Sequence, residues 1–216
     1  MPELTSTTRE TFARHRLIPV VSLPEVDRAA PLADALVEAG LPCVEVTFRT
    51  PAAEDAIRSL AKRSDLFVAA GTVLTIDQAN RAVGAGASCL LSPGTDPEVI
   101  DWCMDKGVDI IPGVATPTDI LHAMRLGLST LKFFPAEAMG GPSALKAIAG
   151  PFPELRFIPT GGISPDNLAD YLALPNVLAC GGSWIANVGR LEQRDFDAVR
   201  KATASARSII RVLNGD

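Results

Sequence analysis

Short, continuously hydrophobic segments recur along nearly the whole chain. Each begins on average about 23 residues after the previous one, and each is unbroken rather than alternating. Unbroken hydrophobic segments of this length are typical of β-strands that are covered on both faces of a parallel sheet. The pattern therefore predicts eight buried strands, at residues 17–21, 43–48, 66–70, 89–92, 108–111, 130–134, 156–159 and 177–180.

Amphipathic segments of helix length lie between these predicted strands. They span residues 25–39, 52–62, 76–83, 97–106, 118–126, 143–149 and 165–172, and a longer one covers 194–212. Several open with a capping residue and a first-turn proline, a pair that favours the start of a helix: Thr50-Pro51, Asp96-Pro97, Thr116-Pro117 and Ser164-Pro165. One further helix is predicted over residues 5–15, before the first strand.

Eight strands that alternate with helices predict an α/β fold, a (β/α)8 TIM barrel. The extra N-terminal helix is expected to close the bottom of the barrel. A doubly wound open sheet is the alternative, although the turn after the first strand lacks the Gly-x-Gly-x-x-Gly signature of its dinucleotide-binding form. Because no linker or low-complexity segment interrupts the alternation, we expect a single domain over residues 1–216.

Composition and charge narrow the class of protein. Of the 216 residues, 47% are hydrophobic and 21% are charged, as in an ordinary globular protein and not a disordered one. The net charge of −5 argues against a nucleic-acid partner, because such proteins present a basic face to the phosphates. No segment approaches the roughly 18 uninterrupted apolar residues of a membrane span, and residues 1–16 have no apolar signal core.

The four cysteines show neither a zinc-site spacing nor a disulfide framework. They stand at positions 43, 89, 103 and 180, and no two form a Cys-x-x-Cys pair. We expect reduced thiols in a cytoplasmic protein. His15 and His122 are isolated in the sequence, so we predict no metal site.

The second predicted strand carries a charged residue on one face. Side chains alternate along a strand, so Glu45, Thr47 and Arg49 share one face while apolar residues occupy the other. The apolar face suits the surrounding helices, which leaves the polar face to point into the barrel. A carboxylate there is costly to bury unless it is paired. The alternative to a functional role is a Glu45–Arg49 ion pair that only stabilises the fold.

The sixth predicted strand places a lysine on the face that points into the barrel. Lys132 alternates with Leu131 and Phe133, so it also points inward. Burial and a nearby cation both disfavour the charged ammonium form, and a neutral amine attacks carbonyl groups to form a Schiff base. The alternative is a lysine that extends outward to pair with a surface carboxylate.

The last two predicted strands run into paired glycines. Gly161 and Gly162 follow the seventh strand, and Gly181 and Gly182 follow the eighth, with Ser183 next. In barrels of this kind, the loops after strands seven and eight bind phosphate through backbone N–H groups. The pattern predicts a phosphate site, and the alternative is two tight turns without a ligand.

The segments that carry these residues together closely resemble the KDPG aldolase family, whose members act on 2-dehydro-3-deoxy-phosphogluconate and on 4-hydroxy-2-oxoglutarate. The resemblance covers roughly residues 10 to 210. Its motifs occur in order along the chain and are read as EVTFRTP from Glu45, GTV from Gly71, SPG from Ser92, PGVATP from Pro112, KFFPAE from Lys132, PTGG from Pro159 and GGS from Gly181.

The resemblance implies a class I, metal-free lyase with no cofactor on a (β/α)8 barrel, assembled as a homotrimer. It implies that Lys132 forms the Schiff base and that Glu45 is the general acid and base. Arg49 matches the residue that pairs with the pyruvyl carboxylate. The remaining matches are Thr72, Pro93 and Phe134 around the pyruvyl group, and Gly161, Gly162, Gly181, Gly182 and Ser183 at the phosphate.

Other functions remain open at this point. An aldolase for the galactonate epimer shares the chemistry and differs only at substrate C4. A phosphate-binding barrel isomerase of sugar or tryptophan metabolism shares the glycine loops but needs no inward lysine. A non-catalytic sugar-phosphate sensor would bind phosphate and form no covalent adduct.

Overall fold

The computed structural model describes residues 4–215, in which strands alternate with helices as the sequence predicts. The strands are β1 Leu17–Val21, β2 Cys43–Thr47, β3 Phe67–Gly71, β4 Cys89–Leu91, β5 Asp109–Ile111, β6 Gly113–Val114, β7 Thr130–Phe133, β8 Arg156–Phe157 and β9 Cys180–Gly182. The helices are α1 Ser6–His15, η1 Val26–Arg28, α2 Ala29–Glu38, α3 Ala53–Leu60, α4 Ile76–Gly84, α5 Pro97–Asp105, α6 Pro117–Arg125, α7 Gly141–Ala149, α8 Leu168–Leu172, α9 Val188–Glu192 and α10 Phe196–Asn214.

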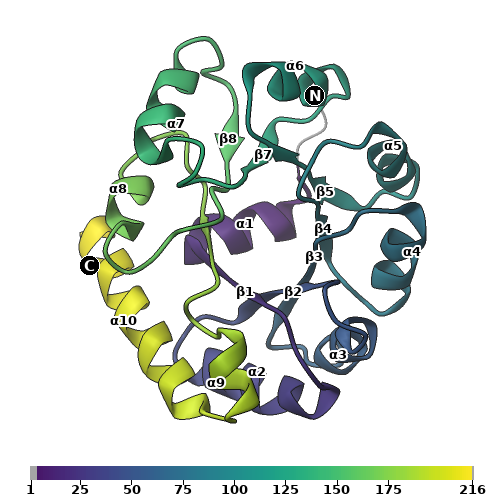
Figure 1. Ribbon diagram of the computed structural model, residues 1–216, viewed down its shortest axis with the longest axis vertical. Coiled ribbons are helices and arrows are strands. Elements are labelled where there is room, and N and C mark those ends of the chain that lie inside the picture. The colour runs from purple at the N-terminus through teal and green to yellow at the C-terminus, as the bar shows by residue number, and fades with distance from the viewer. Residues whose placement is uncertain (1–3, 216) are drawn as a thin grey trace.

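The strands form two parallel sheets, which the helices other than α1 surround (Figure 1). The larger sheet has the order β5-β4-β3-β2-β1-β9, and the smaller has the order β6-β7-β8. In the larger sheet, Val20 pairs with Glu45 and Glu45 pairs with Ala69, so the Glu45 backbone lies between β1 and β3. In the smaller sheet, Gly113 pairs with Lys132.

The prediction of one closed sheet of eight strands is therefore not confirmed, because the backbone hydrogen bonds form two separate sheets. The sheets separate at two prolines, Pro112 between β5 and β6 and Pro159 after β8. Proline has no N–H to donate, so it interrupts a ladder. Isolated bridges join Phe157 to Val177 and Thr160 to Gly181 between the two sheets.

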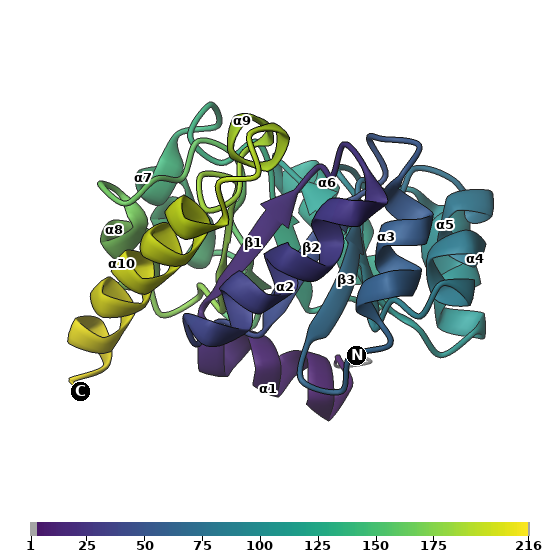
Figure 2. The ribbon, with the colours of Figure 1, turned by 90° about the horizontal axis from the view of Figure 1, so that it is seen from below.

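Two hydrophobic clusters cover the two sides of the strands. The larger lies between the strands and the outer helices and includes Val44, Val46, Leu131 and Phe133. The smaller lies on the opposite side, here called the inner face, and joins Phe12 of α1 to residues from several strands, namely Ile18, Ala69, Cys89, Leu91, Ile111, Ile158 and Ala179. Figure 2 shows α1 beneath the end at which β1 begins. The predicted N-terminal helix is thus present, with Phe12 fully buried.

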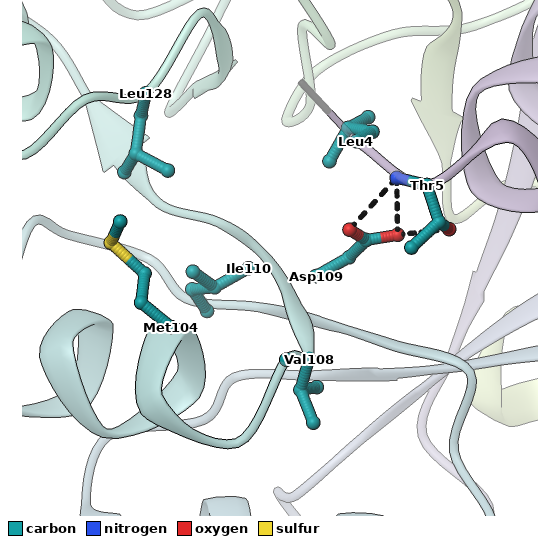
Figure 3. Close-up of a pocket in the computed structure, with 8 residues that line it drawn as sticks. Leu4, Thr5, Met104, Val108, Asp109, Ile110 and Leu128 are labelled. Carbon is teal, nitrogen blue, oxygen red and sulfur yellow. Dashed lines mark hydrogen bonds between the residues drawn. The ribbon is translucent and has the colours of Figure 1, made fainter. Parts of the chain in front are cut away.

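Asp109 anchors the start of α1 to β5 (Figure 3). The Thr5 backbone N–H donates to Asp109 Oδ1 over 3.0 Å, and the Thr5 hydroxyl donates to Oδ2 over 2.6 Å. Beside this contact lies a pocket of about 230 Å³ that is lined mainly by apolar side chains, among them Leu4, Met104, Val108, Ile110 and Leu128. It lies at the amino ends of the strands, away from the ends where chemistry is expected.

Helix α10 illustrates how the hydrophobic pattern selects the packed face of a helix. Its buried residues Val199, Thr203, Ala206 and Ile210 recur at intervals of three or four and form one stripe. This stripe faces the body of the protein, and α10 packs against α2 and α8 (Figure 2). The Thr203 hydroxyl donates to Val199 O over 2.8 Å, which explains how a polar side chain is buried there.

Several predicted boundaries differ from the structure. Helix α9 was not predicted, and β9 begins at Cys180 rather than at residue 177. Thr50 does not cap α3, because its hydroxyl donates to Leu23 O over 2.6 Å. Helix α8 begins at Leu168, after Asn167 rather than after Ser164. Asp96 and Thr116 do cap α5 and α6 as expected.

All four cysteines are free and buried. Burial raises the pKa of the Cys43 thiol to about 12 and that of Cys103 to about 11. Among residues 4–215 no helix has the length and apolar character to span a bilayer. The same residues contain no group of three or more histidine, cysteine or acidic side chains arranged to hold a metal ion.

Candidate active site

Lys132 and Glu45 form a buried ion pair on the inner face. Nζ of Lys132, on β7, donates a hydrogen bond to Oε1 of Glu45, on β2, over 2.9 Å. The Lys132 side chain is 6% exposed and the Glu45 side chain is 1% exposed. The second carboxylate oxygen, Oε2, is buried without a hydrogen-bond partner in the part of the chain that the structure describes. A primary amine and a carboxylate with one uncommitted oxygen therefore meet at a site that is almost inaccessible to solvent.

The alternation of β7 places Lys132 at this site. Leu131 and Phe133 are fully buried in the cluster beneath the outer helices, so the residue between them points to the inner face. The predicted inward orientation is confirmed, and the alternative of a lysine extending to the surface is wrong. The Lys132 N–H also donates to Pro112 O over 2.8 Å, which holds β7 beside the interrupted strand.

The alternation of β2 places Glu45 in the same way. Val44 and Val46 face the outer helices, and Glu45 points to the inner face between them. The alternative of a Glu45–Arg49 ion pair is wrong, because the partner of Glu45 is Lys132. The buried carboxylate and the buried amine thus satisfy one another across the inner face.

Arg49 lies beyond the end of β2 and is exposed. Its backbone N–H donates to Thr47 O over 2.8 Å, so the chain turns directly after the strand. The alternation of β2 ends at that turn and does not extend to Arg49. No hydrogen bond or ion pair joins its guanidinium to another residue between 4 and 215, so the cation is available to an anionic ligand.

Of three further predicted residues, Phe134 contacts the pair, while Pro93 and Thr72 lie at the ends of strands in the same sheets. The Phe134 ring lies near Lys132, with 5.8 Å between Nζ and the ring centroid. The Pro93 backbone lies against Gly113, the residue of β6 that pairs with Lys132; a Cβ added to Gly113 would lie 2.1 Å from Pro93 O. Thr72 directly follows β3 with φ of 56°, a left-handed conformation that threonine rarely adopts. Such backbone conformations concentrate at functional sites.

The two glycine pairs come together beside Phe134. Thr160 bridges Gly181, so the segments after β8 and within β9 are neighbours. Gly161 follows Thr160, and an added Cβ there would lie 3.4 Å from the Phe134 ring. The glycine loops therefore adjoin the lysine site.

Local geometry explains why these positions are glycine. Gly161 and Gly162 have φ values of 100° and 81°, in the region that favours glycine. A Cβ on Gly181 would lie 2.3 Å from the Thr160 hydroxyl oxygen, and Gly182 has similarly little room. Within residues 4–215 the backbone N–H groups of Gly161, Gly162 and Ser183 donate to no protein acceptor. Three uncommitted donors close together suit an anion.

The family model described as KDPG and KHG aldolase matches residues 8–202. This chain belongs to the KDPG and KHG aldolase family. The resemblance seen in the sequence motifs is thereby confirmed.

Individual members of the KDPG and KHG aldolase family are similar over most of their length. A 2-dehydro-3-deoxy-phosphogluconate aldolase of Treponema pallidum is 46% identical over 94% of this chain and 98% of its own. A KHG/KDPG aldolase of Escherichia coli K12 is 44% identical over 88% of this chain and 90% of its own. A solved KDPG aldolase of Legionella pneumophila, which holds pyruvate captured at low pH as a covalent carbinolamine intermediate, is 38% identical with a TM-score of 0.89, over 92% of this chain and 97% of that one.

One position beside the pair was not predicted to have a role. Gly71 entered the sequence prediction only as the first residue of the GTV motif, yet it lies against the Glu45 carboxylate. The signal was present in β3, where Ala69, Ala70 and Gly71 form a run of small residues beside the strand that carries Glu45. Small residues opposite a predicted inward carboxylate indicate space reserved for it.

Proposed function

We propose that this member of the KDPG and KHG aldolase family is a class I aldolase that cleaves 2-dehydro-3-deoxy-6-phospho-D-gluconate to pyruvate and D-glyceraldehyde 3-phosphate. The observation that carries the proposal is the buried 2.9 Å contact between Lys132 Nζ and Glu45 Oε1. The same chemistry serves 4-hydroxy-2-oxoglutarate, which has the same 2-keto acid and C4 hydroxyl.

Substrate binding assigns a role to each end of the site. The substrate carboxylate pairs with the Arg49 guanidinium in a charge-assisted contact. Thr72, Pro93 and Phe134 enclose the pyruvyl group. The phosphate lies at the other end, against Ser183 and the two glycine segments, Gly161-Gly162 and Gly181-Gly182, where backbone N–H groups neutralise its charge.

The first half of the reaction forms the covalent intermediate. Glu45 accepts a proton from the Lys132 ammonium, and the free amine attacks the C2 carbonyl carbon to form a carbinolamine. Loss of water, with a proton returned by Glu45 to the departing hydroxyl, leaves an iminium between Nζ and C2. The iminium carries the positive charge that later accepts the bonding electrons.

The second half breaks the carbon–carbon bond. Glu45, directly or through one water, takes the C4 hydroxyl proton. The C3–C4 electron pair moves toward the iminium nitrogen, D-glyceraldehyde 3-phosphate departs and an enamine remains. Protonation of the enamine carbon, with Glu45 as the proton carrier, restores the iminium, and hydrolysis releases pyruvate and the lysine amine. One carboxylate serves each transfer because every half-reaction regenerates it.

We further propose that the two sheets act as one closed (β/α)8 barrel in a single domain over residues 1–216. Hydrogen bonds that cross the proline interruptions support this, from Lys132 N to Pro112 O and from Gly181 N to Pro159 O, each over 2.8 Å. Residues 1–3 and 216 lie outside the described residues. The family resemblance supports a homotrimer without a metal or other cofactor, and the buried free thiols support a cytoplasmic location.

Trapping with pyruvate tests the proposed chemistry. The protein is incubated with pyruvate, reduced with borohydride, digested and analysed by mass spectrometry. A covalent mass increase on Lys132 is the expected result, and exposed Lys146 is the internal control that should stay unmodified. The absence of any increase would favour the isomerase or the non-catalytic sensor. Comparing turnover of the gluconate and galactonate epimers then identifies the preferred substrate.

A further inference from the structure

Gly71 ends β3 beside the Glu45 carboxylate. Its backbone does not adopt the left-handed conformation, so φ alone does not require glycine here. A Cβ placed on Gly71 would lie 2.0 Å from Glu45 Oε1 and 2.7 Å from both Cγ and Cδ of the same side chain. Real Cβ atoms essentially never come within 3.0 Å of such a neighbour. Glu45 therefore occupies the space in which any other residue at position 71 would place its side chain.

The clash is specific to one side chain. The three heavy atoms nearest to that Cβ all belong to Glu45. At Gly113, by contrast, an added Cβ would meet the backbone of Pro93, and at Gly84 it would meet nothing within 4 Å. Gly71 thus differs both from glycines required by the backbone and from glycines with open space around them.

Glu45 has little freedom to move away. It is 1% exposed, and its backbone is paired on both sides, with Val20 of β1 and Ala69 of β3. The oxygen that an added Cβ would approach most closely is Oε1, the atom that accepts the hydrogen bond from Lys132. Displacing the carboxylate therefore means breaking this contact.

We propose that Gly71 is a positioning residue, which holds the Glu45 carboxylate against Lys132 by leaving that space empty. The proposal rests on the proposed aldolase function for its kinetic consequences. Gly71→Ala should misplace the proton carrier while leaving the lysine able to reach a keto acid. The steps that slow are then those in which Glu45 moves a proton, foremost protonation of the enamine.

A double-mutant cycle tests this dependence on Glu45. The four proteins are the wild type, Gly71→Ala, Glu45→Ala and the double variant, with Gly84→Ala as the matched glycine control. One readout is exchange of the pyruvate methyl protons with deuterium as a function of pH, and the other is the midpoint of thermal unfolding. Glu45→Ala removes Cγ, Cδ and Oε1, the three atoms that lie nearest to a Cβ added at Gly71.

We expect Gly71→Ala to slow methyl exchange by about 100-fold and to change its pH profile, a loss of the size given by removing a general acid–base group. In the Glu45→Ala background the same substitution should change exchange by less than about twofold. It should lower the unfolding midpoint only when Glu45 is present. Gly84→Ala should match the wild type in exchange.

Equal losses from Gly71→Ala in both backgrounds would overturn the proposal, and so would wild-type exchange in Gly71→Ala. If Gly71→Ala alone does not fold, folding of the double variant supports the proposal and its failure to fold overturns it. Failure of the aldolase function is recognised separately, because the wild type would then neither exchange methyl protons nor trap pyruvate. In that case the unfolding midpoints alone decide whether Gly71 makes room for Glu45.

Discussion

Lys132 Nζ lies 2.9 Å from Glu45 Oε1 although 87 residues separate them along the chain. The contact links β7 of the smaller sheet to β2 of the larger one across the inner face. A buried ion pair is a weak source of stability, because desolvation of the two charges offsets most of their attraction. The burial of an amine against a carboxylate whose second oxygen has no hydrogen-bond partner among residues 4–215 is better explained by chemistry than by stability.

Replacing the lysine should abolish the covalent route. Lys132→Met removes the nucleophile, so we expect turnover to fall more than about 1,000-fold and pyruvate trapping to disappear. Steady-state kinetics and borohydride trapping measure the two effects. Lys146→Met, at an exposed position on α7, is the control and should keep full activity.

The same substitution leaves Glu45 buried without its partner. Removing one member of a buried pair costs about 3–5 kcal/mol, so Lys132→Met should unfold more easily than the wild type. Lys132→Met/Glu45→Gln should recover much of that loss and remain inactive. Appreciable turnover in either variant would rule out the Schiff-base mechanism.

Replacing the carboxylate should slow proton transfer and leave adduct formation possible. Glu45→Gln keeps the side-chain shape but has no basic oxygen, so exchange of the pyruvate methyl protons should slow by about 100-fold. Nuclear magnetic resonance follows this exchange in deuterated water. Glu98→Gln, on the exposed surface of α5, is the control. Exchange at the wild-type rate would remove Glu45 from the enamine step.

Arg49 should determine affinity for the keto acid. Losing a hydrogen bond to a charged group costs about 1.5–3 kcal/mol, so Arg49→Ala should raise KM about 10- to 100-fold. Arg49→Lys keeps the charge but not the planar guanidinium group, so its KM should lie between those of the wild type and Arg49→Ala. An unchanged affinity for pyruvate together with equal losses for every aldehyde acceptor would contradict this role.

Ser183 should act only on the phosphorylated substrate. Its hydroxyl is exposed beyond β9, and Ser183→Ala removes one neutral hydrogen-bond donor worth about 1 kcal/mol. We expect KM for the phosphorylated sugar acid to rise about fivefold, with no change for 4-hydroxy-2-oxoglutarate, which has no phosphate. KM is measured for both substrates with the wild type and with Ser183→Ala. An equal rise in KM for the two substrates would place Ser183 away from the phosphate.

Alternation along short buried strands explains what could be predicted from the sequence. Leu131 and Phe133 are apolar on both sides of Lys132, so its orientation follows from local pattern alone. The same rule does not extend to Arg49, because β2 ends at Thr47 and a backbone hydrogen bond from Arg49 N to Thr47 O turns the chain there. That turn leaves no periodic signal in the residues.

Contacts between distant segments account for the rest. The 2.9 Å pair of Lys132 and Glu45 depends on the arrangement of whole strands, which periodicity does not specify. The division into two sheets depends on how Pro112 and Pro159 interrupt neighbouring ladders. Gly71 was informative only once the register beside Glu45 was known. Motif resemblance identified the chemistry, and the fold explains how the residues meet.

A histidine far from the active site should make stability depend on pH. His15, at the end of α1, is 8% exposed, and its Nδ1 has no hydrogen-bond partner among residues 4–215. Burial, followed by the nearby Arg207 and Arg14 cations, lowers the pKa of His15 to about 4, against about 6.5 in the unfolded chain. Between these pH values the unfolded chain binds a proton at this histidine that the folded protein does not bind. The contribution of neutral His15 to the free energy of unfolding is therefore fully present above about pH 6.5 and is lost as the pH falls toward 4.

His15→Leu removes that dependence. We expect the free energy of unfolding of the variant, relative to the wild type, to increase by about 2 kcal/mol when the pH is lowered from 7 to 4.5. Urea unfolding at a series of pH values measures the difference, in which the titration of carboxylates common to both proteins cancels. His122→Leu, at an exposed position on α6, is the matched histidine substitution measured alongside it. A constant difference between His15→Leu and the wild type across this range would show that His15 is protonated in the folded protein as readily as in the unfolded chain.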